Sequence, residues 1–319
     1  MIFRPTHASD LDRLLPLIVT DAAGGMTADT YTTRLAAGEY RPEWTWVAED
    51  GAGGAPLALA VWWGGPDDAL PNALDGLFVA DQAGPPAEHT ALAAELLAAG
   101  HAAYAAAGAD AAPDYHLSLP GDWRERPDVV AAVTWRREAA RRAGLPVSLE
   151  RLRYEWTPRC GLPEPRGRLV FAAEPDDEVF VDLFRRVLTD SLDTDSTKEA
   201  ASMGAQAQAR GDVEFYRDTM PGERSWWRVA RTPAGEVVGF GLPSRNHAFA
   251  VVGYLGVVPE HRGRGYADEI LAEITRILVV ETDPEKVRAD TDLTNVPMAA
   301  AFERVGYRND ARRLVLSAH

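Results

Sequence analysis

The sequence predicts an α/β protein with a mixed sheet, built from two similar domains in tandem. Two observations support this class: strand and helix patterns alternate along the chain, and the same order of elements occurs on both sides of a segment rich in proline and glycine. A chain of 319 residues is long enough for two domains. The segment 157–167 is the expected linker, so we expect domains at 1–157 and 168–319.

The first half is predicted to begin with a short strand, Ile2–Arg4, and a helix that Ser9 or Asp10 caps. Apolar and aromatic runs between turn residues predict the strands, and alanine-rich or periodic runs predict the helices. The remaining elements expected here are a helix at 27–37, strands at 44–49, 57–63 and 74–79, a helix at about 87–107, a strand at 115–119, a helix at 129–142 and a strand at 147–156.

The second half repeats this order. A strand at 169–173 precedes an amphipathic helix marked by apolar residues of the run 179–187, and a polar helical region follows at 197–219. The sequence TPAGE predicts a hairpin turn between strands at 227–231 and 237–242. The remaining expected elements are a strand–turn–helix at 254–278, a strand at 287–292, a helix at 297–304 and a strand near 313–316.

The stretch from Tyr254 to Leu278 is the most informative part of the chain. An apolar strand ends at Pro259, a turn of Arg262, Gly263, Arg264 and Gly265 follows, and an amphipathic helix then begins. Free backbone N–H groups and the positive end of the helix dipole meet at such a turn. The turn therefore favours binding of phosphate groups.

Two other nucleotide motifs do not fit this turn. Asp268 stands where a GxGxxG dinucleotide motif requires its third glycine, and no GxxxxGK[ST] sequence occurs in the chain.

The spacing Arg262-x-x-Gly265-x-Ala267 resembles the R/Q-x-x-G-x-G/A signature of the GNAT superfamily of acyl-CoA-dependent N-acyltransferases. The resemblance implies acetyl-CoA as cofactor, with its pyrophosphate on these amides and its pantetheine arm and thioester on the backbone of the preceding strand. It also implies two GNAT-like domains in tandem, a layout similar to that of mycothiol synthase. The implied cofactor-binding residues are Val257, Val258, Arg262, Gly263, Arg264, Gly265, Tyr266, Ala267 and Asn295.

Asn295 belongs to a second resemblance. The sequence Asn295-x-x-Met298, followed by Phe302-Glu303-Arg304-x-Gly306-Tyr307, resembles the N-x-x-A…LYE-x-x-GF motif of the family. Asn295 would contact the cofactor, or it would cap the following helix. Phe302 replaces the tyrosine that commonly protonates the leaving thiolate, and Tyr307 or Tyr266 could substitute for it.

The residue that deprotonates the acceptor is harder to predict. Removing a proton from an alkylamine at pH 7 costs about 4–5 kcal/mol, and the strand before the turn contains no acid. Tyr254 is its only titratable side chain, Asp290 and Asp292 alternate on the next strand, and His247 precedes the turn strand. We expect Asp292 or Tyr254 to be catalytic.

Composition limits the possible partners. The net charge of −15 makes nucleic acid a poor partner, and no apolar run approaches the ~20 residues of a membrane span. The start of the chain lacks the pattern of a signal peptide, and the single Cys160 excludes an internal disulfide or a multi-cysteine zinc site. We expect a cytoplasmic protein without a metal. The acidic segment 190–227 favours a cationic acceptor, a small-molecule or peptide amine.

These patterns predict an N-acetyltransferase whose second half binds acetyl-CoA and whose acceptor amine attacks the thioester directly. A non-catalytic ligand- or CoA-binding protein on the same fold is the alternative, and O-acylation or a longer acyl donor also stays open. If Val79 is aligned with Val258, Ala83 and Pro85 stand opposite the two arginines of the turn, Pro86 stands opposite Gly265, and Glu88 stands opposite Ala267. We therefore expect the first half to bind no cofactor.

Overall fold

The computed structural model describes residues 1–19, 23, 25–80, 83, 86–246 and 249–318, and the chain forms two compact units. Unit 1 comprises Met1–Glu150 and Ala311–His319, and unit 2 comprises Arg151–Asp310. These units replace the linear boundaries 1–157 and 168–319 that we expected. The boundaries differ because the last strand of each half pairs within the unit formed by the other half.

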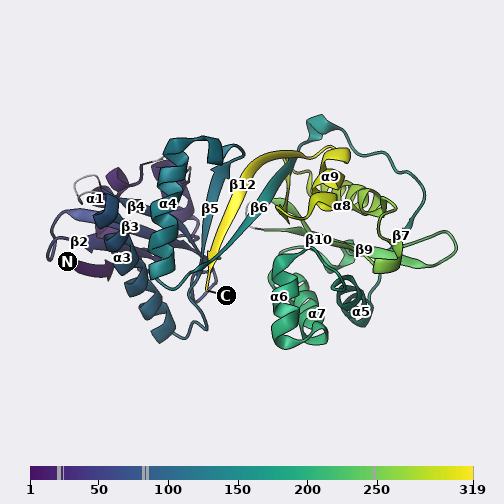
Figure 1. Cartoon of the computed structure of the whole chain (residues 1–319), viewed down its shortest axis with the longest axis horizontal. Coiled ribbons are helices and arrows are strands. Elements are labelled where there is room, and N and C mark those ends of the chain that lie inside the picture. Colours follow the sequence, from purple (N-terminus) through teal and green to yellow (C-terminus); the bar gives the residue numbers. More distant parts are fainter. Residues whose placement is uncertain (20–22, 24, 81–82, 84–85, 247–248, 319) are drawn as a thin grey trace. The chain divides into compact units, whose positions relative to one another are not determined.

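The sheet of unit 1 has the strand order β1-β2-β3-β4-β5-β12 (Figure 1). The strands are antiparallel except for β4 and β5, which pair in parallel. The elements of this unit are β1 (Ile2–Pro5), α1 (Leu11–Leu14), α2 (Ala28–Ala36), β2 (Thr45–Glu49), β3 (Pro56–Trp63), β4 (Ala73–Val79), α3 (Pro86–Ala106), β5 (Asp114–Pro120), α4 (Pro127–Arg142) and the part of β12 (Arg308–Ser317) from Ala311 onwards.

The sheet of unit 2 has the corresponding strand order, β7-β8-β9-β10-β11-β6, in which the exchanged strand β6 is again the last. Here too one pair of neighbours, β10 and β11, is parallel. The elements of unit 2 are β6 (Val147–Trp156), β7 (Val170–Ala172), α5 (Asp177–Val187), α6 (Thr194–Met203), α7 (Ala205–Glu214), β8 (Arg228–Arg231), β9 (Val237–Arg245), β10 (Ala250–Val257), α8 (Tyr266–Thr282), β11 (Val287–Asp292) and α9 (Val296–Arg304).

The final strands of the two halves are exchanged. β6 ends the first half in sequence but pairs antiparallel with β11, with Trp156 opposite Val287 and Arg151 opposite Asp292. β12 ends the chain and pairs antiparallel with β5 of unit 1. Each half alone therefore lacks one strand of the sheet to which most of its residues belong.

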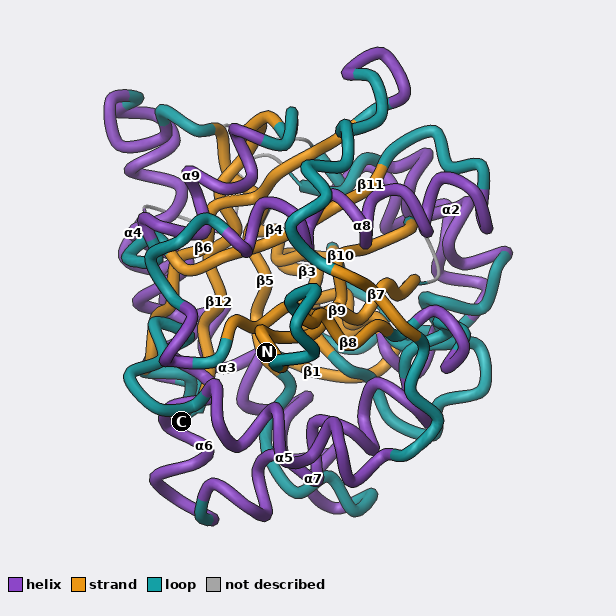
Figure 2. Tube along the Cα trace, turned by 90° about the vertical axis from the view of Figure 1, so that its right-hand side faces the viewer, coloured by secondary structure: helices purple, strands orange, loops and turns teal. Residues whose placement is uncertain are grey.

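Helices cover both faces of the sheet of unit 2. Figure 2 shows β8, β9 and β10 between α8 on one side and α5 and α7 on the other. Ile270, Ile274 and Phe302 belong to the core on the α8–α9 side, whereas Phe184 and Phe240 belong to the core on the α5–α7 side. Gly239 and Gly241 of β9 let α8 approach closely, because a Cβ at either glycine would lie within about 3 Å of an α8 isoleucine.

The sheet of unit 1 is covered in the same way, with α3 and α4 over one face and α1 and α2 over the other. The helix expected after Asp10 is short: α1 ends at Leu14, and a 3₁₀ turn containing Pro16 follows. No helix in the described part of the chain has the length and hydropathy needed to cross a bilayer.

Candidate functional site

β10 and β11 separate soon after they begin. They pair only at Ala250–Val287 and Val251–Arg288, so the backbone of residues 252–257 has no partner in β11. On its other edge β10 stays paired with β9 as far as Val257. We call this separation of the two strands the splay. It exposes one edge of a central strand, which sheets otherwise pair or cover.

The hydrogen-bond pattern of β10 shows which amides face the splay. The N–H of Val258 donates to the carbonyl of Val238 at 3.0 Å, towards β9. N–H groups alternate between the two edges of a strand, so the amides of Leu255 and Val257 face the splay. Leu255 is an addition to the predicted set, because the edge that each amide faces follows from the hydrogen bond of Val258 and not from the sequence.

Val258 itself does not fit its predicted role. Its N–H is bonded to Val238, its carbonyl accepts from His261 at 3.0 Å, and its side chain is buried. A residue whose N–H already donates to the sheet has no backbone donor left for the cofactor. We therefore remove Val258 from the candidate cofactor residues and keep Val257.

The turn after β10 has the geometry expected of an anion site. Gly263 and Gly265 have φ values of +76° and +71°, which disfavour any residue with a Cβ, and Gly265 precedes the first residue of α8. Within the described residues, nothing accepts a hydrogen bond from the amides of residues 263–267. Gly263 and Arg264 are exposed, and Tyr266 and Ala267 are half-buried. Several donors at the positive end of a 17-residue helix therefore remain available.

Arg262 does not contribute its charge to this site as predicted. Its Nε donates to the carbonyl of Val257 at 3.1 Å, and its Nη atoms donate to the carbonyls of Val187 at 2.7 Å and Thr189 at 2.6 Å. The guanidinium thus caps the C-terminal end of α5. Arg264 is the exposed arginine of the turn, and its Nη1 lies 3.4 Å from Nδ1 of His261.

Arg168 supports the turn from the opposite side. Its Nη atoms donate to the carbonyls of Arg264 at 2.9 Å and Gly265 at 3.1 Å, and its guanidinium lies 4.9 Å from the centre of the Tyr266 ring. In a planar trans peptide the N–H points away from the C=O. The amides of Gly265 and Tyr266 therefore point away from Arg168. No sequence pattern identified Arg168, because 96 residues separate it from Arg264.

The acids in the first turn of α8 do not oppose anion binding. Asp268 and Glu269 are both buried. Asp268 accepts a bidentate pair of hydrogen bonds from Arg304, at 2.8 and 2.9 Å. Glu269 accepts two from Arg168, one from its Nε at 2.5 Å and one from its backbone amide at 3.1 Å. Arginines thus compensate both carboxylates next to the amides.

The second motif is mainly structural. The Asn295 side chain accepts a hydrogen bond from the Met298 amide at 3.3 Å, so it caps α9, which was the alternative to a cofactor contact. Phe302 is buried and stacks on Tyr154 at 4.8 Å between ring centres. Tyr307 is also buried, its hydroxyl lies 2.7 Å from that of Thr275, and burial raises its pKa. Tyr307 is therefore no substitute for the missing tyrosine.

Asp292 is held at the end of β11 and is buried. Its Oδ1 accepts from Nε of Arg151 at 3.1 Å, and its Oδ2 accepts from the amide of Thr194 at 2.7 Å. Both carboxylate oxygens are thus engaged by donors within the protein. We reassign Asp292 from general base to anchor of the α6 N-terminus.

Tyr254 lies on the face of the sheet covered by α5 and α7. Its ring contacts Phe184, at 4.7 Å between centres, and stacks on Phe240 at 5.7 Å. Burial, and after it the charges of Asp193 and Asp212, raise its pKa. Tyr254 therefore stays protonated at neutral pH, where it can donate a hydrogen bond but cannot act as a base. His247, the other residue considered, lies outside the described residues.

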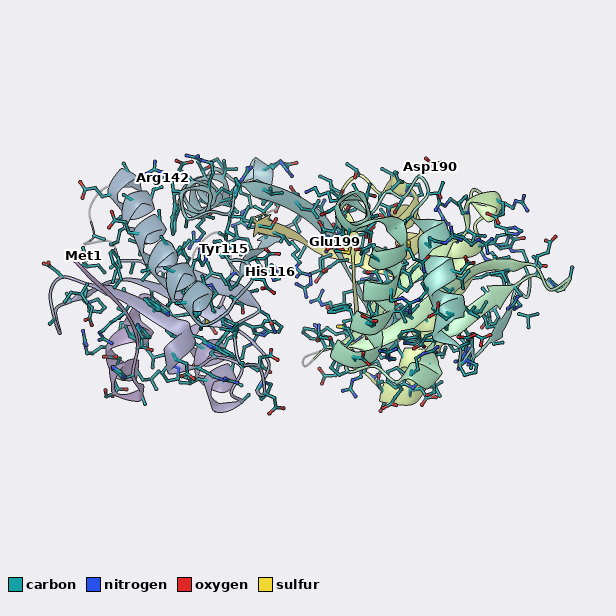
Figure 3. The ribbon with its side chains drawn as sticks, turned by 90° about the horizontal axis from the view of Figure 1, so that it is seen from below. Met1, Tyr115, His116, Arg142, Asp190 and Glu199 are labelled. Carbon is teal, nitrogen blue, oxygen red and sulfur yellow. The ribbon has the colours of Figure 1, made fainter. Side chains whose placement is uncertain are left out.

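Sequence reasoning missed Asp212 on α7. Its Oδ1 accepts from Nε2 of Gln208 at 3.1 Å, and the same nitrogen donates to Glu199 at 2.6 Å; Glu199 on α6 is labelled in Figure 3. Its Oδ2 is buried and has no hydrogen-bond partner among the described residues. Burial, together with the charges of Glu199 and Asp193, raises the pKa of Asp212 to about 7. Nothing in the sequence separates Asp212 from the exposed acids around it.

Unit 1 contains a splay at the corresponding place. β4 and β5 pair only at Ala73–Asp114 and Leu74–Tyr115. Here, however, the buried Arg136 of α4 donates to the carbonyl of Leu77 on β4 at 3.0 Å. In unit 1 an arginine side chain thus bonds to the edge of β4, whereas the corresponding edge of β10 in unit 2 is unpaired.

Hydrogen bonds also correct the alignment of the two halves. The Ala80 amide donates to the carbonyl of Leu57 at 2.8 Å, just as Val258 donates to Val238, so Ala80 and not Val79 corresponds to Val258. Residues 81–85 then separate this position from α3, against 259–265 before α8. The connection in unit 1 is therefore shorter in sequence, and residues 81, 82, 84 and 85 of it lie outside the described residues.

Comparisons with known proteins address the family and the fold. Residues 172–308 match the family model described as "Acetyltransferase (GNAT) domain". No curated protein sequence matches the chain.

Solved structures show the same fold at low sequence identity. A GCN5-related N-acetyltransferase from Sphaerobacter thermophilus superposes with a TM-score of 0.57 at 15% identity, covering 98% of this chain and 94% of its own. The glucosamine N-acetyltransferase region of a fungal multi-domain β-N-acetylglucosaminidase gives 0.55 at 15% identity, covering 98% of this chain and 38% of the fungal one. The match of residues 172–308, within this fold, shows that unit 2 carries a GNAT acetyltransferase domain.

Proposed function

We propose that unit 2 transfers an acetyl group from acetyl-CoA to the amine of a small molecule or peptide. The observation that carries the proposal is the splay of β10 from β11 directly beside a turn whose amides have no acceptor among the residues that the structure describes. The exposed edge of one strand and the start of one helix thus offer two groups of backbone donors, which together form an interrupted row. Such a row suits a long ligand that ends in phosphates.

The residues present fit coenzyme A. The amides of residues 263–267 and the side chain of Arg264 would hold its pyrophosphate, and the amides of Leu255 and Val257 would hold its pantetheine arm and thioester carbonyl. When bound, the cofactor supplies the activated acyl group. A backbone donor aimed at the developing oxyanion is worth about 3–4 kcal/mol.

Asp212 is the proton acceptor in this proposal. A cationic acceptor (R–NH₃⁺) gives one proton to the Asp212 carboxylate, and the resulting neutral amine forms the new C–N bond. The C–S bond then breaks, and the nitrogen loses its second proton to the departing thiolate. A carboxyl group with a pKa of about 7 is suited to this step, because efficient general bases have a pKa near the working pH.

The rival reading is a protein that binds coenzyme A without turnover, motivated by Phe302 in place of the family's tyrosine. Thiol release from acetyl-CoA in the presence of a panel of primary amines separates the two functions. We expect turnover with at least one cationic amine. Tight binding of acetyl-CoA with no thiol release above hydrolysis across the panel would favour the rival.

A further inference from the structure

Arg151 occupies an unusual place, because it lies on the exchanged strand β6, which precedes the expected linker. It is directly opposite Asp292 in the β6–β11 register. Its Nε donates to Asp292 at 3.1 Å and its Nη2 donates to Asp195 of α6 at 2.6 Å. About a fifth (21%) of its side chain is exposed. One guanidinium thus connects the end of β11 with the first turn of α6.

The start of α6 is fastened by these contacts. Asp292 accepts from the amide of Thr194, the first residue of α6, at 2.7 Å, and Asp193 caps the helix through the amide of Ser196 at 2.8 Å. Charged groups that accept backbone N–H bonds at a helix start form strong, oriented contacts. Arg151 therefore fixes where the N-cap residue Asp193 lies.

That position matters for the groups proposed to handle the acceptor. The charge of Asp193 contributes to the raised pKa values of Asp212, Tyr216 and Tyr254, after burial in each case. The Ser196 side chain lies close to the Tyr254 phenol and opposes part of the rise in its pKa. The hydroxyl of Tyr216 donates to the carbonyl of Gly253, at the bulge of β10, at 2.8 Å. The start of α6 is therefore close to Tyr216 and Tyr254, and so is Asp212, the proposed proton acceptor.

We propose that Arg151 is a positioning residue for the acceptor side of unit 2, supplied by the first half of the chain. Through Asp292 and Asp195 it holds α6 so that Asp193 and Ser196 keep their places beside Tyr254 and Asp212. It contacts none of the residues of the glycine-rich turn in the described contacts, so its effect falls on the amine and not on coenzyme A. This inference rests on the proposed acetyl transfer.

The matched control is Arg153, two residues along β6 on the same face, which pairs across the sheet with Asp290 at 3.9 Å. Arg151→Met removes the link to α6, Arg151→Lys keeps a cation there, and Arg153→Met removes a neighbouring cross-strand charge. We expect Arg151→Met to raise the KM for the amine by about tenfold or more, because small displacements of positioning groups have large kinetic effects. The Kd for coenzyme A should change less than about twofold, within normal mutational scatter.

Arg151→Lys should raise the KM for the amine less than Arg151→Met does, and Arg153→Met should leave this KM near the wild-type value. Equal KM values for Arg151→Met and Arg153→Met, or a parallel loss of coenzyme A affinity, would overturn the inference. Hydrogen exchange of the peptide covering α6 gives a readout independent of activity: it should accelerate in Arg151→Met only. Unchanged exchange overturns the positioning role, whereas wild-type protein that releases no thiol with any amine overturns the proposed function.

Discussion

At the scale of single residues, Asp212 differs from the three buried acids of unit 2 described above. Asp268, Glu269 and Asp292 each contact an arginine, but no basic side chain contacts Asp212 in the described part of the chain. Burial and neighbouring carboxylates therefore raise its pKa without any opposing cation. This environment favours a group that exchanges a proton near neutral pH.

A pH–rate profile tests this assignment. The carboxyl group must be ionised to accept a proton, so wild-type kcat/KM should rise with pH and level off above the pKa of about 7. Asp212→Asn should abolish this limb and lower kcat by about 100-fold or more, the usual value of general base catalysis. Glu214→Gln on the same helix, an exposed acid, is the control and should keep the limb. An unchanged limb in Asp212→Asn would rule out Asp212 as the base.

Arg262 and Arg264 are neighbours with different roles. Replacing Arg262 by Met leaves carbonyls at the end of α5 without their donor, so it should lower the free energy of unfolding by about 1–3 kcal/mol. Arg264→Met should leave that free energy nearly unchanged and weaken coenzyme A binding, because an exposed cation beside a phosphate acts on the ligand alone. Thermal unfolding and calorimetry on both variants provide the two measurements. If Arg264→Met lowers the stability and Arg262→Met weakens only coenzyme A binding, the structural role belongs to Arg264 and the binding role to Arg262.

At the scale of elements, the glycine-rich turn and the start of α8 act as one anion site. Gly265→Asp puts a carboxylate among the free amides and should weaken coenzyme A binding more than tenfold, which corresponds to about 1.4 kcal/mol. Gly235→Asp in the β8–β9 hairpin is the matched control, because Gly235 also has a positive φ of +90° and open space around it. Both variants carry backbone strain, so only a difference in their coenzyme A affinities reports on the binding of phosphate groups. Equal affinities in two folded variants would disprove the anion site.

At the scale of the whole molecule, the two units share a strand order but differ at the splay. In unit 1 the side chain of Arg136 donates a hydrogen bond to the edge of β4. The equivalent residue in unit 2 is Met298, because Arg136 and Met298 each lie eight residues before a glycine, Gly144 or Gly306. The connection that follows β4 is also shorter in sequence than the one that follows β10. We therefore expect one coenzyme A per chain.

Calorimetric titration of the full chain with coenzyme A measures this stoichiometry. Gly265→Asp should weaken the single binding event, because we expect the site in unit 2 alone. A stoichiometry near two, or a second event that survives in Gly265→Asp, would show that unit 1 also binds coenzyme A. Arg136→Met, which gives unit 1 the residue of unit 2, tests whether the arginine alone prevents binding.

Local patterns determined most of the elements. The strand at 147–156 and the strand at 287–292 have the predicted bounds, because apolar alternation and flanking turns are properties of the local sequence. The turn at Gly263 and Gly265 was also predictable, since positive φ values restrict the residue type. The GNAT domain was recognised through this turn, and the family match agrees.

Only the tertiary structure decided which unit each final strand joins, because β6 and β12 have partners that no local pattern specifies. It likewise decided the side-chain chemistry of the site. Asp292 and Arg262 looked available in the sequence, but Arg151 and the end of α5 engage them, and Asp212 gained its raised pKa from burial and from charges on another helix. Sequence determines backbone preferences locally, whereas the ionisation and contacts of a side chain depend on neighbours that folding brings from distant positions.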